Sequence, residues 1–112
     1  KEYVSYFQHY DQKGYRALLE DAIREHNPDL IMYQAGADDW IGDPLGGTNT
    51  VAQLYQRDVA TFTLAKRRGI PVVCNLAGGY AENFQDTLCI HLNTGEAMKE
   101  VYLGTEKRDL AS

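Results

Sequence analysis

The 112-residue sequence predicts an α/β fold in which a parallel sheet is flanked by helices. Three segments show the apolar spacing of amphipathic helices, and two short apolar runs lie between them. The expected order is therefore helix, strand, helix, strand, helix. A strand–helix–strand unit with such a long crossover requires parallel strands, and the crossover is expected to be right-handed. The length fits one domain, so residues 1–112 are expected to form a single unit.

The first helix is expected to end at His26, after an irregular aromatic segment over residues 1–12 that we expect to be a loop or a short edge segment. The positions that recur at helical spacing are Tyr15, Leu18, Leu19, Ala22, Ile23 and His26. Asn27-Pro28 ends the helix, because proline disfavours helical geometry in the preceding residue. Residues 30–34 (LIMYQ) then predict a strand that is apolar, and so buried, on both faces.

The second helix is expected over about residues 51–68, with Thr50 or Asn49 as its N-cap and Gly69 as its stop. Its apolar stripe comprises Val51, Leu54, Tyr55, Val59, Phe62 and Ala65. Residues 71–76 (PVVCNL) predict the second strand, and a third helix is expected from about residue 83 to 102. The apolar stripe of that helix comprises Phe84, Leu88, His91, Met98 and Val101. Residues 104–112 are expected to fray.

Parallel strands end at the same edge of a sheet, and ligands of open parallel sheets bind outside the carboxyl ends of the strands. The loop after the first strand carries Asp38 and Asp39, and the loop after the second leads into Tyr80. We therefore expect the two loops to converge. Two strands are few for a parallel sheet, which is normally covered on both faces. Either residues 1–10 supply another strand, or the chain completes its sheet with another polypeptide or a second copy.

Composition and charge weigh against several partners. The net charge is −5 and the basic residues are scattered, which does not suit nucleic acid. No apolar run approaches the length of a membrane span and no signal peptide is visible, so no membrane partner is expected. Cys74 and Cys89 form no CxxC pair and are expected to be buried, reduced thiols, which suits a cytoplasmic location.

Two loop positions are candidates for chemistry. Asp38 directly follows a strand, and a metal ligand requires such a rigid support, although an aspartate pair in a loop is more often a solvated turn or a cap. Tyr80 follows Gly78 and Gly79, which permit close approach of the backbone to a ligand. Its phenol can donate a hydrogen bond to an oxyanion that develops on a carbonyl, and the alternative is a tyrosine packed under the third helix.

The remaining candidates are weaker. His9, His26 and His91 are candidates for a base or a ligand, but His91 lies on an apolar stripe and is better explained as a core histidine whose hydrogen bonds are satisfied. Trp40 either walls a pocket or anchors its loop. The sequence holds no His-His pair and no Asp-x-His.

Residues 29–47 (DLIMYQAGADDWIGDPLGG) and 57–80 (RDVATFTLAKRRGIPVVCNLAGGY) resemble the C-terminal part of the histone deacetylase superfamily. The bacterial deacetylase-like and acetoin-utilisation-like members are nearest in character. The segment DTLCIHLNTGEAM resembles the helix that follows the tyrosine turn in those proteins, so the likeness covers about residues 15–102. It implies a partial arginase/deacetylase-like fold, whose complete form has an eight-stranded parallel sheet.

The resemblance also implies a site. In the family, zinc is held by an Asp-x-His pair and a second aspartate, which matches Asp38, and the catalytic tyrosine matches Tyr80. Gly36, Gly78 and Gly79 match the substrate-binding loops. There the metal polarises an amide carbonyl and activates water, a His-His pair shuttles protons, and the tyrosine stabilises the oxyanion.

Three hypotheses follow. In the first, the chain is the C-terminal portion of a zinc-dependent amide hydrolase, with an acetylated amide as substrate of the full-length enzyme. Alone it would bind no zinc and be inactive, because the His-His and Asp-x-His elements of a missing N-terminal segment are absent. In the second, it is a stand-alone, truncated, non-catalytic module that forms homo-oligomers. In the third, it donates Asp38 and Tyr80 to a site shared with another protein.

Overall fold

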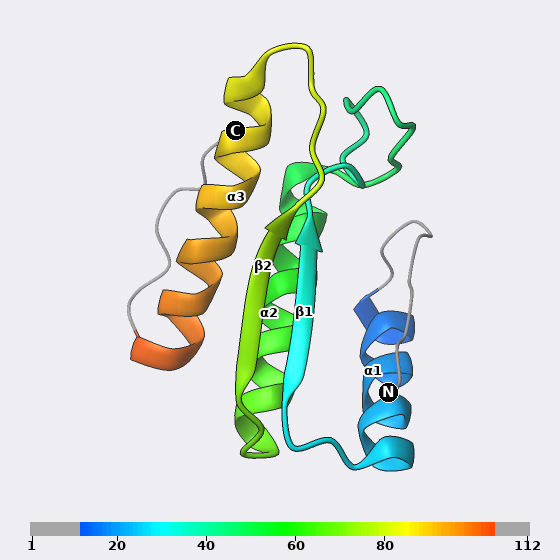
Figure 1. The fold of residues 1–112 in the computed structure, drawn as a ribbon, viewed down its shortest axis with the longest axis vertical. Helices are drawn as coiled ribbons and strands as arrows, with labels where there is room; N and C mark the ends of the chain where they lie inside the picture. The colour runs from blue at the N-terminus through cyan, green and yellow to red at the C-terminus, as the bar shows by residue number, and fades with distance from the viewer. Residues whose placement is uncertain (1–11, 105–112) are drawn as a thin grey trace.

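The computed structural model describes residues 12–104, which contain three α-helices, two strands and a terminal π-helical turn (Figure 1). The elements in chain order are α1 (Gln12–His26), β1 (Ile31–Gly36), α2 (Val51–Arg67), β2 (Val72–Ala77), α3 (Phe84–Met98) and η1 (Lys99–Leu103). The α/β class and the expected order of elements are confirmed. The predictions for residues 1–11 and for the tail from residue 105 lie outside the described residues. Within residues 12–104, no helix is both long enough and apolar enough to cross a membrane.

The two strands pair in parallel, with Ile31 opposite Val72 and Gly36 opposite Ala77. Each strand runs slightly further than expected, to Gly36 and to Ala77. Because these final residues are paired with each other, both following loops leave the sheet at the same edge. The predicted parallel pairing and common edge are therefore confirmed.

The two faces of this sheet differ in their covering. Tyr33 and Ala35 are buried on one face, and α2 runs along the sheet behind the strands in Figure 1. On the opposite face Met32 is 70% exposed and Val73 is 45% exposed. The expectation that the first strand is buried on both faces is therefore wrong within residues 12–104. Its burial alternates along the chain, as in a sheet covered on one side.

Helix α2 is the centre of the packing. Its N-cap is Thr50, whose hydroxyl accepts the Gln53 N–H at 3.1 Å, while the Gln53 side chain accepts the Thr50 N–H at 2.8 Å. This reciprocal pair is a capping box. Gly69 follows the helix at φ 66°, as a glycine stop requires. The predicted stripe faces inward, with Leu54, Tyr55, Phe62 and Ala65 all buried.

Helix α3 is rotated from the expected orientation over its N-terminal part, whereas Met98 and, in η1, Val101 of the expected stripe pack against the core as predicted. Phe84 and Leu88, which were expected to face the core, are 70% and 45% exposed. The buried residues are instead Ile90, Asn93, Thr94 and Ala97. The rotation turns Thr94 toward α2, where its hydroxyl donates to the buried carboxylate of Asp58 at 2.5 Å. A buried carboxylate needs donors, so this polar contact outweighs the apolar stripe read from the sequence.

The side chain of Asp58 on α2 forms hydrogen bonds with residues of β1 and α3. Its side chain is only 1% exposed, and it accepts hydrogen bonds from the Tyr33 hydroxyl of β1, from Thr94 of α3 and from Arg57 Nε at 3.1 Å. Burial raises the pKa of Tyr33 well above its ordinary value, so the phenol keeps its proton and acts as a donor. Tyr33 also packs edge-on against Phe62, with ring centroids 5.7 Å apart. The polar network thus lies inside the apolar core.

We predict that Asp58→Ala lowers the free energy of unfolding by about 3 kcal/mol, because it removes the acceptor of Arg57 Nε and of two buried hydroxyls. Urea unfolding followed by circular dichroism measures this loss. The matched control is Asp29→Ala, since Asp29 is exposed, and it should change stability by no more than about 0.5 kcal/mol. Equal effects of the two substitutions would contradict the assigned role of Asp58.

Candidate functional site

The carboxylate of Asp38 occupies a gap that two glycines leave open at the ends of both strands. A Cβ atom added at Gly78 would lie 2.0 Å from Asp38 Oδ1, and one added at Gly36 would lie 2.6 Å from the same oxygen. Gly78 also has φ 61°, a conformation that favours glycine. The structure therefore brings Asp38 together with Gly36 and Gly78, as the convergence of the two loops predicted.

Asp39 faces a different partner. Its Oδ2 lies 3.5 Å from Nη1 of Arg57, whose side chain is 8% exposed, and the same Nη1 donates to the Gly36 carbonyl at 2.9 Å. Burial raises the pKa of Asp39, the Arg57 charge lowers it, and the neighbouring carboxylate of Asp38 raises it. The two adjacent aspartates therefore have different neighbours: Asp38 lies against the glycines, and Asp39 pairs with Arg57. Arg57 was not singled out from the sequence, although a charged Arg–Asp pair inside an apolar helical stripe was a signal for it.

Tyr80 is held by its main chain. Its N–H donates to Asp43 Oδ2 at 2.7 Å, while the other oxygen of Asp43 accepts the Leu45 N–H at 2.9 Å. The Tyr80 side chain is 58% exposed, so the alternative in which it packs under α3 is wrong. Asp43 is 4% exposed and was also missed from the sequence, where only its place before a proline in a glycine-rich loop marked it.

The glycine turn before Tyr80 also contacts α3. A Cβ atom added at Gly79, which has φ 113°, would lie 2.4 Å from Cγ2 of Thr87. His91 Nε2 lies 3.2 Å from the Gly78 carbonyl oxygen. Because a carbonyl can only accept, Nε2 carries the proton. This polar contact agrees with the expectation of a satisfied histidine, although His91 is half-buried rather than fully inside the core.

The other candidates lie apart from this corner or support it indirectly. His26 is exposed at the end of α1, and His9 lies outside the described residues. Trp40 packs with Ala37, Leu54 and Ile90, which favours the loop anchor over the pocket wall. Cys74 and Cys89 are free thiols but half-buried rather than buried.

The donor set does not by itself fit a zinc ion. Among the residues that the structure describes, no three His, Cys, Asp or Glu side chains are grouped closely enough to hold a metal. A catalytic zinc usually has three protein ligands. Asp38 could supply one of them, whereas Asp39 is directed to Arg57.

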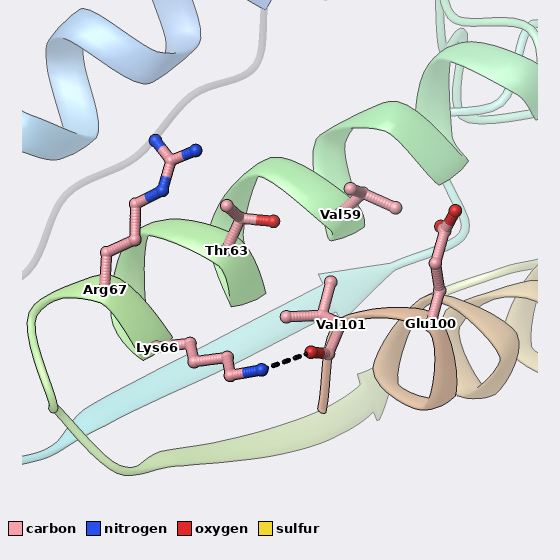
Figure 2. Close-up of a pocket in the computed structure, with 6 residues that line it drawn as sticks. All are labelled: Val59, Thr63, Lys66, Arg67, Glu100 and Val101. Atoms are coloured by element: carbon pink, nitrogen blue, oxygen red, sulfur yellow. Dashed lines mark hydrogen bonds between the residues drawn. The ribbon is translucent and has the colours of Figure 1, made fainter. Parts of the chain in front are cut away.

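A separate hollow of about 500 Å³ lies between α2 and η1, lined by Val59, Thr63, Lys66, Arg67, Glu100 and Val101 (Figure 2). Lys66 Nζ donates to the Val101 carbonyl at 2.9 Å across this hollow. Lys66 and Arg67 belong to the last turn of α2, at the opposite end of the helix from the two loops (Figure 1). None of the predicted site residues lines the hollow, so it is distinct from the corner of Asp38 and Tyr80.

Comparison with known proteins identifies the family. The model of the histone deacetylase domain matches residues 4–94, which is most of the chain. The chain belongs to the histone deacetylase family. An uncharacterized protein of Picosynechococcus sp. is 37% identical over 99 residues, which cover 82% of this chain and 32% of that protein. Histone deacetylase 2 of Arabidopsis thaliana is 38% identical over 66 residues, covering 58% of this chain and 17% of that protein.

Membership of the histone deacetylase family agrees with the geometry. The family is generally zinc-dependent, and the chain spans about a third or less of the length of these two relatives. The Asp38 and Tyr80 loops both lie within the matched residues. The roles of Asp38 as a metal ligand and of Tyr80 as a catalytic residue stay predictions, and so does the role of Gly36, Gly78 and Gly79 in substrate binding.

We predict that Gly78→Ala lowers the free energy of unfolding by about 1–3 kcal/mol, because an alanine methyl at positive φ would collide with the Asp38 carboxylate. Gly95→Ala is the matched control, since nothing lies within 4 Å of an added Cβ at Gly95 inside α3. That control should stabilise the protein by about 0.5–1 kcal/mol through helix propensity. Thermal unfolding of both variants provides the comparison, and a neutral Gly78→Ala would contradict the tight contact.

Proposed function

We propose that this chain is the C-terminal portion of a zinc-dependent, histone-deacetylase-like amide hydrolase. One observation carries the proposal: the Asp38 carboxylate lies against Gly78, two residues before Tyr80. The aspartate motif and the tyrosine motif of the family therefore meet at one sheet edge. The Asp38 side chain lies in the gap between two strand ends, and such rigid elements are a suitable support for a ligand.

In this proposal the residues of the chain supply two parts of the site. Asp38 contributes one carboxylate to the metal centre, and Gly36 and Gly78 leave room for that carboxylate. The exposed phenol of Tyr80 donates a hydrogen bond to the oxyanion that forms when an acetylated amide is attacked. Because residues 12–104 do not fit a zinc ion alone, the remaining ligands and the proton-transferring histidines would come from elsewhere in the enzyme.

The uncovered surfaces support the same proposal. The sheet face that carries Met32 and Val73 has no layer over it within the described residues, whereas parallel sheets are normally covered on both sides. The matched relatives are about three or more times longer than the stretch they share with this chain. The rest of a deacetylase domain would provide the missing layer and neighbouring strands.

We further propose a cytoplasmic location, which the free thiols of Cys74 and Cys89 suit.

The test compares the chain alone with the chain joined to the complementary segment of a family member that carries the His-His and Asp-x-His elements. We expect the chain alone to hold less than one zinc per molecule and to leave an acetyl-lysine peptide intact. The joined protein should bind zinc and hydrolyse the peptide. In it, Tyr80→Phe should lower kcat by about 10²–10³-fold with zinc retained, and Asp38→Ala should lower zinc content measured by plasma mass spectrometry.

Asp29→Asn is the control for these variants, because it changes an exposed carboxylate outside the site. It should preserve both zinc content and kcat. A joined protein in which Tyr80→Phe keeps full kcat, or in which Asp38→Ala keeps full zinc, would contradict the proposal.

A second candidate function is that of a non-catalytic module that self-associates. The exposed side of α3 favours it, because Phe84, Leu88 and Leu92 follow one another at four-residue spacing and are 70%, 45% and 55% exposed. Residues four apart share one helix face, so these side chains form a continuous apolar stripe. A second copy is the occupant that would cover this stripe in the isolated chain.

We predict that the isolated chain forms dimers or larger oligomers in light scattering, and that the double substitution Leu88→Lys with Leu92→Lys shifts it to a monomer. The charged side chains would oppose burial that stabilises by about 1.5–3 kcal/mol per leucine. Substitution of Arg24 by Glu on the exposed surface of α1 is the control and should leave the mass unchanged. A chain that stays monomeric at high concentration would rule out this second function.

A further inference from the structure

We infer that Asp43 and His91 are positioning residues for Tyr80, and that they act by fixing the main chain of the glycine turn from two sides. The inference rests on the proposed function of Tyr80 as the oxyanion donor. Neither residue touches the reacting atoms in this scheme. Each instead contacts a main-chain group within the three residues that end at Tyr80.

Asp43 holds the turn from the loop that follows β1. Its two carboxylate oxygens accept different N–H groups, from Tyr80 at 2.7 Å and from Leu45 at 2.9 Å. The side chain is 4% exposed, so water competes little for these bonds. One buried carboxylate therefore joins the two loops that leave the same edge of the sheet, and Tyr80 is fixed relative to the loop that carries Asp38.

His91 holds the turn from the third turn of α3. Its Nε2–H group donates to the Gly78 carbonyl at 3.2 Å. Thr87, one helical turn earlier, packs so close to Gly79 that no side chain would fit there. The turn is thus fixed at the carbonyl of Gly78, at the Cα of Gly79 and at the N–H of Tyr80.

This arrangement answers a physical requirement of the proposed reaction. An oxyanion donor is effective only when held near its productive position, within about 0.5 Å. The Tyr80 side chain is 58% exposed and follows two glycines in positive-φ conformations, so neither packing nor local backbone preference fixes it. Hydrogen bonds to the surrounding main chain remove the backbone freedom and leave only side-chain rotation.

The first arm of the test uses the full chain and amide hydrogen exchange measured by nuclear magnetic resonance. Asp43→Asn keeps the shape of the side chain but replaces one acceptor oxygen by an NH₂ group, so one of the two N–H groups loses its acceptor. We expect exchange at the Tyr80 amide to accelerate about tenfold or more relative to the core amide of Phe62. The control Asp29→Asn should leave this ratio unchanged. General destabilisation would accelerate both amides together, and that outcome would overturn the inference.

His91 provides a second, independent variant in case Asp43→Asn folds poorly. His91→Leu removes the donor to Gly78 and should also accelerate exchange selectively at the turn. His91→Gln keeps an N–H donor at a similar distance from the backbone and should restore slow exchange at Tyr80. Equal exchange in the Leu and Gln variants would overturn the role of His91.

The second arm uses the joined deacetylase described above and separates this inference from the proposed function. Asp43→Asn should lower kcat about 10-fold or more with KM and zinc content unchanged, and it should add nothing on a Tyr80→Phe background. If Asp43→Asn lowered kcat by the same factor on the Tyr80→Phe background, the inference would be overturned, because Asp43 would then act through another group. If Tyr80→Phe alone leaves kcat intact while the exchange effect is present, the proposed function fails and the fixed turn stands.

Discussion

The buried carboxylate of Asp58 is the contact on which the remaining structure depends. It lies on the central helix and accepts hydrogen bonds from β1 and α3, so it joins α2 to two of the elements that pack against it. It also pairs with Arg57, whose Nη2 lies 3.1 Å from its Oδ1. Arg57 in turn reaches the Gly36 carbonyl and Asp39 at the end of β1. A charge in the core is thereby linked to the corner that carries the predicted site.

The candidate site depends on two glycines, which have no side chain, as much as on the side chain of Asp38. The Asp38 carboxylate occupies volume that any residue other than glycine would fill at positions 36 and 78. The backbone of both glycines therefore lies close to this carboxylate. The loop after β1 and the loop after β2 therefore pack together. A second contact between them is the hydrogen bond from the Tyr80 N–H to the Asp43 carboxylate.

The chain matches only part of longer members of the histone deacetylase family, and one face of its sheet has no covering layer within the described residues. Both observations agree with a chain that is part of a larger domain. The described residues form a core of polar and apolar side chains on one side of the two strands. The opposite side carries the exposed apolar residues Met32 and Val73, and the outer stripe of α3 is exposed and apolar. Exposed apolar surfaces of this kind mark interfaces in folded proteins.

The sequence by itself determined the local features. Helical spacing, the Thr50 cap and the Gly69 stop gave the elements and their order, because each depends on neighbours within a few residues. The length of the crossover gave the parallel pairing. The common corner of Asp38 and Tyr80 followed from that parallel pairing, because parallel strands end at the same edge of a sheet. Tertiary structure alone decided which face of α3 is buried, how Asp39 and Asp38 divide their partners, and that Asp43 and His91 contact the tyrosine turn. These outcomes depend on hydrogen bonds between groups 13 to 37 residues apart, and a buried polar group chooses its partner only when the elements have packed.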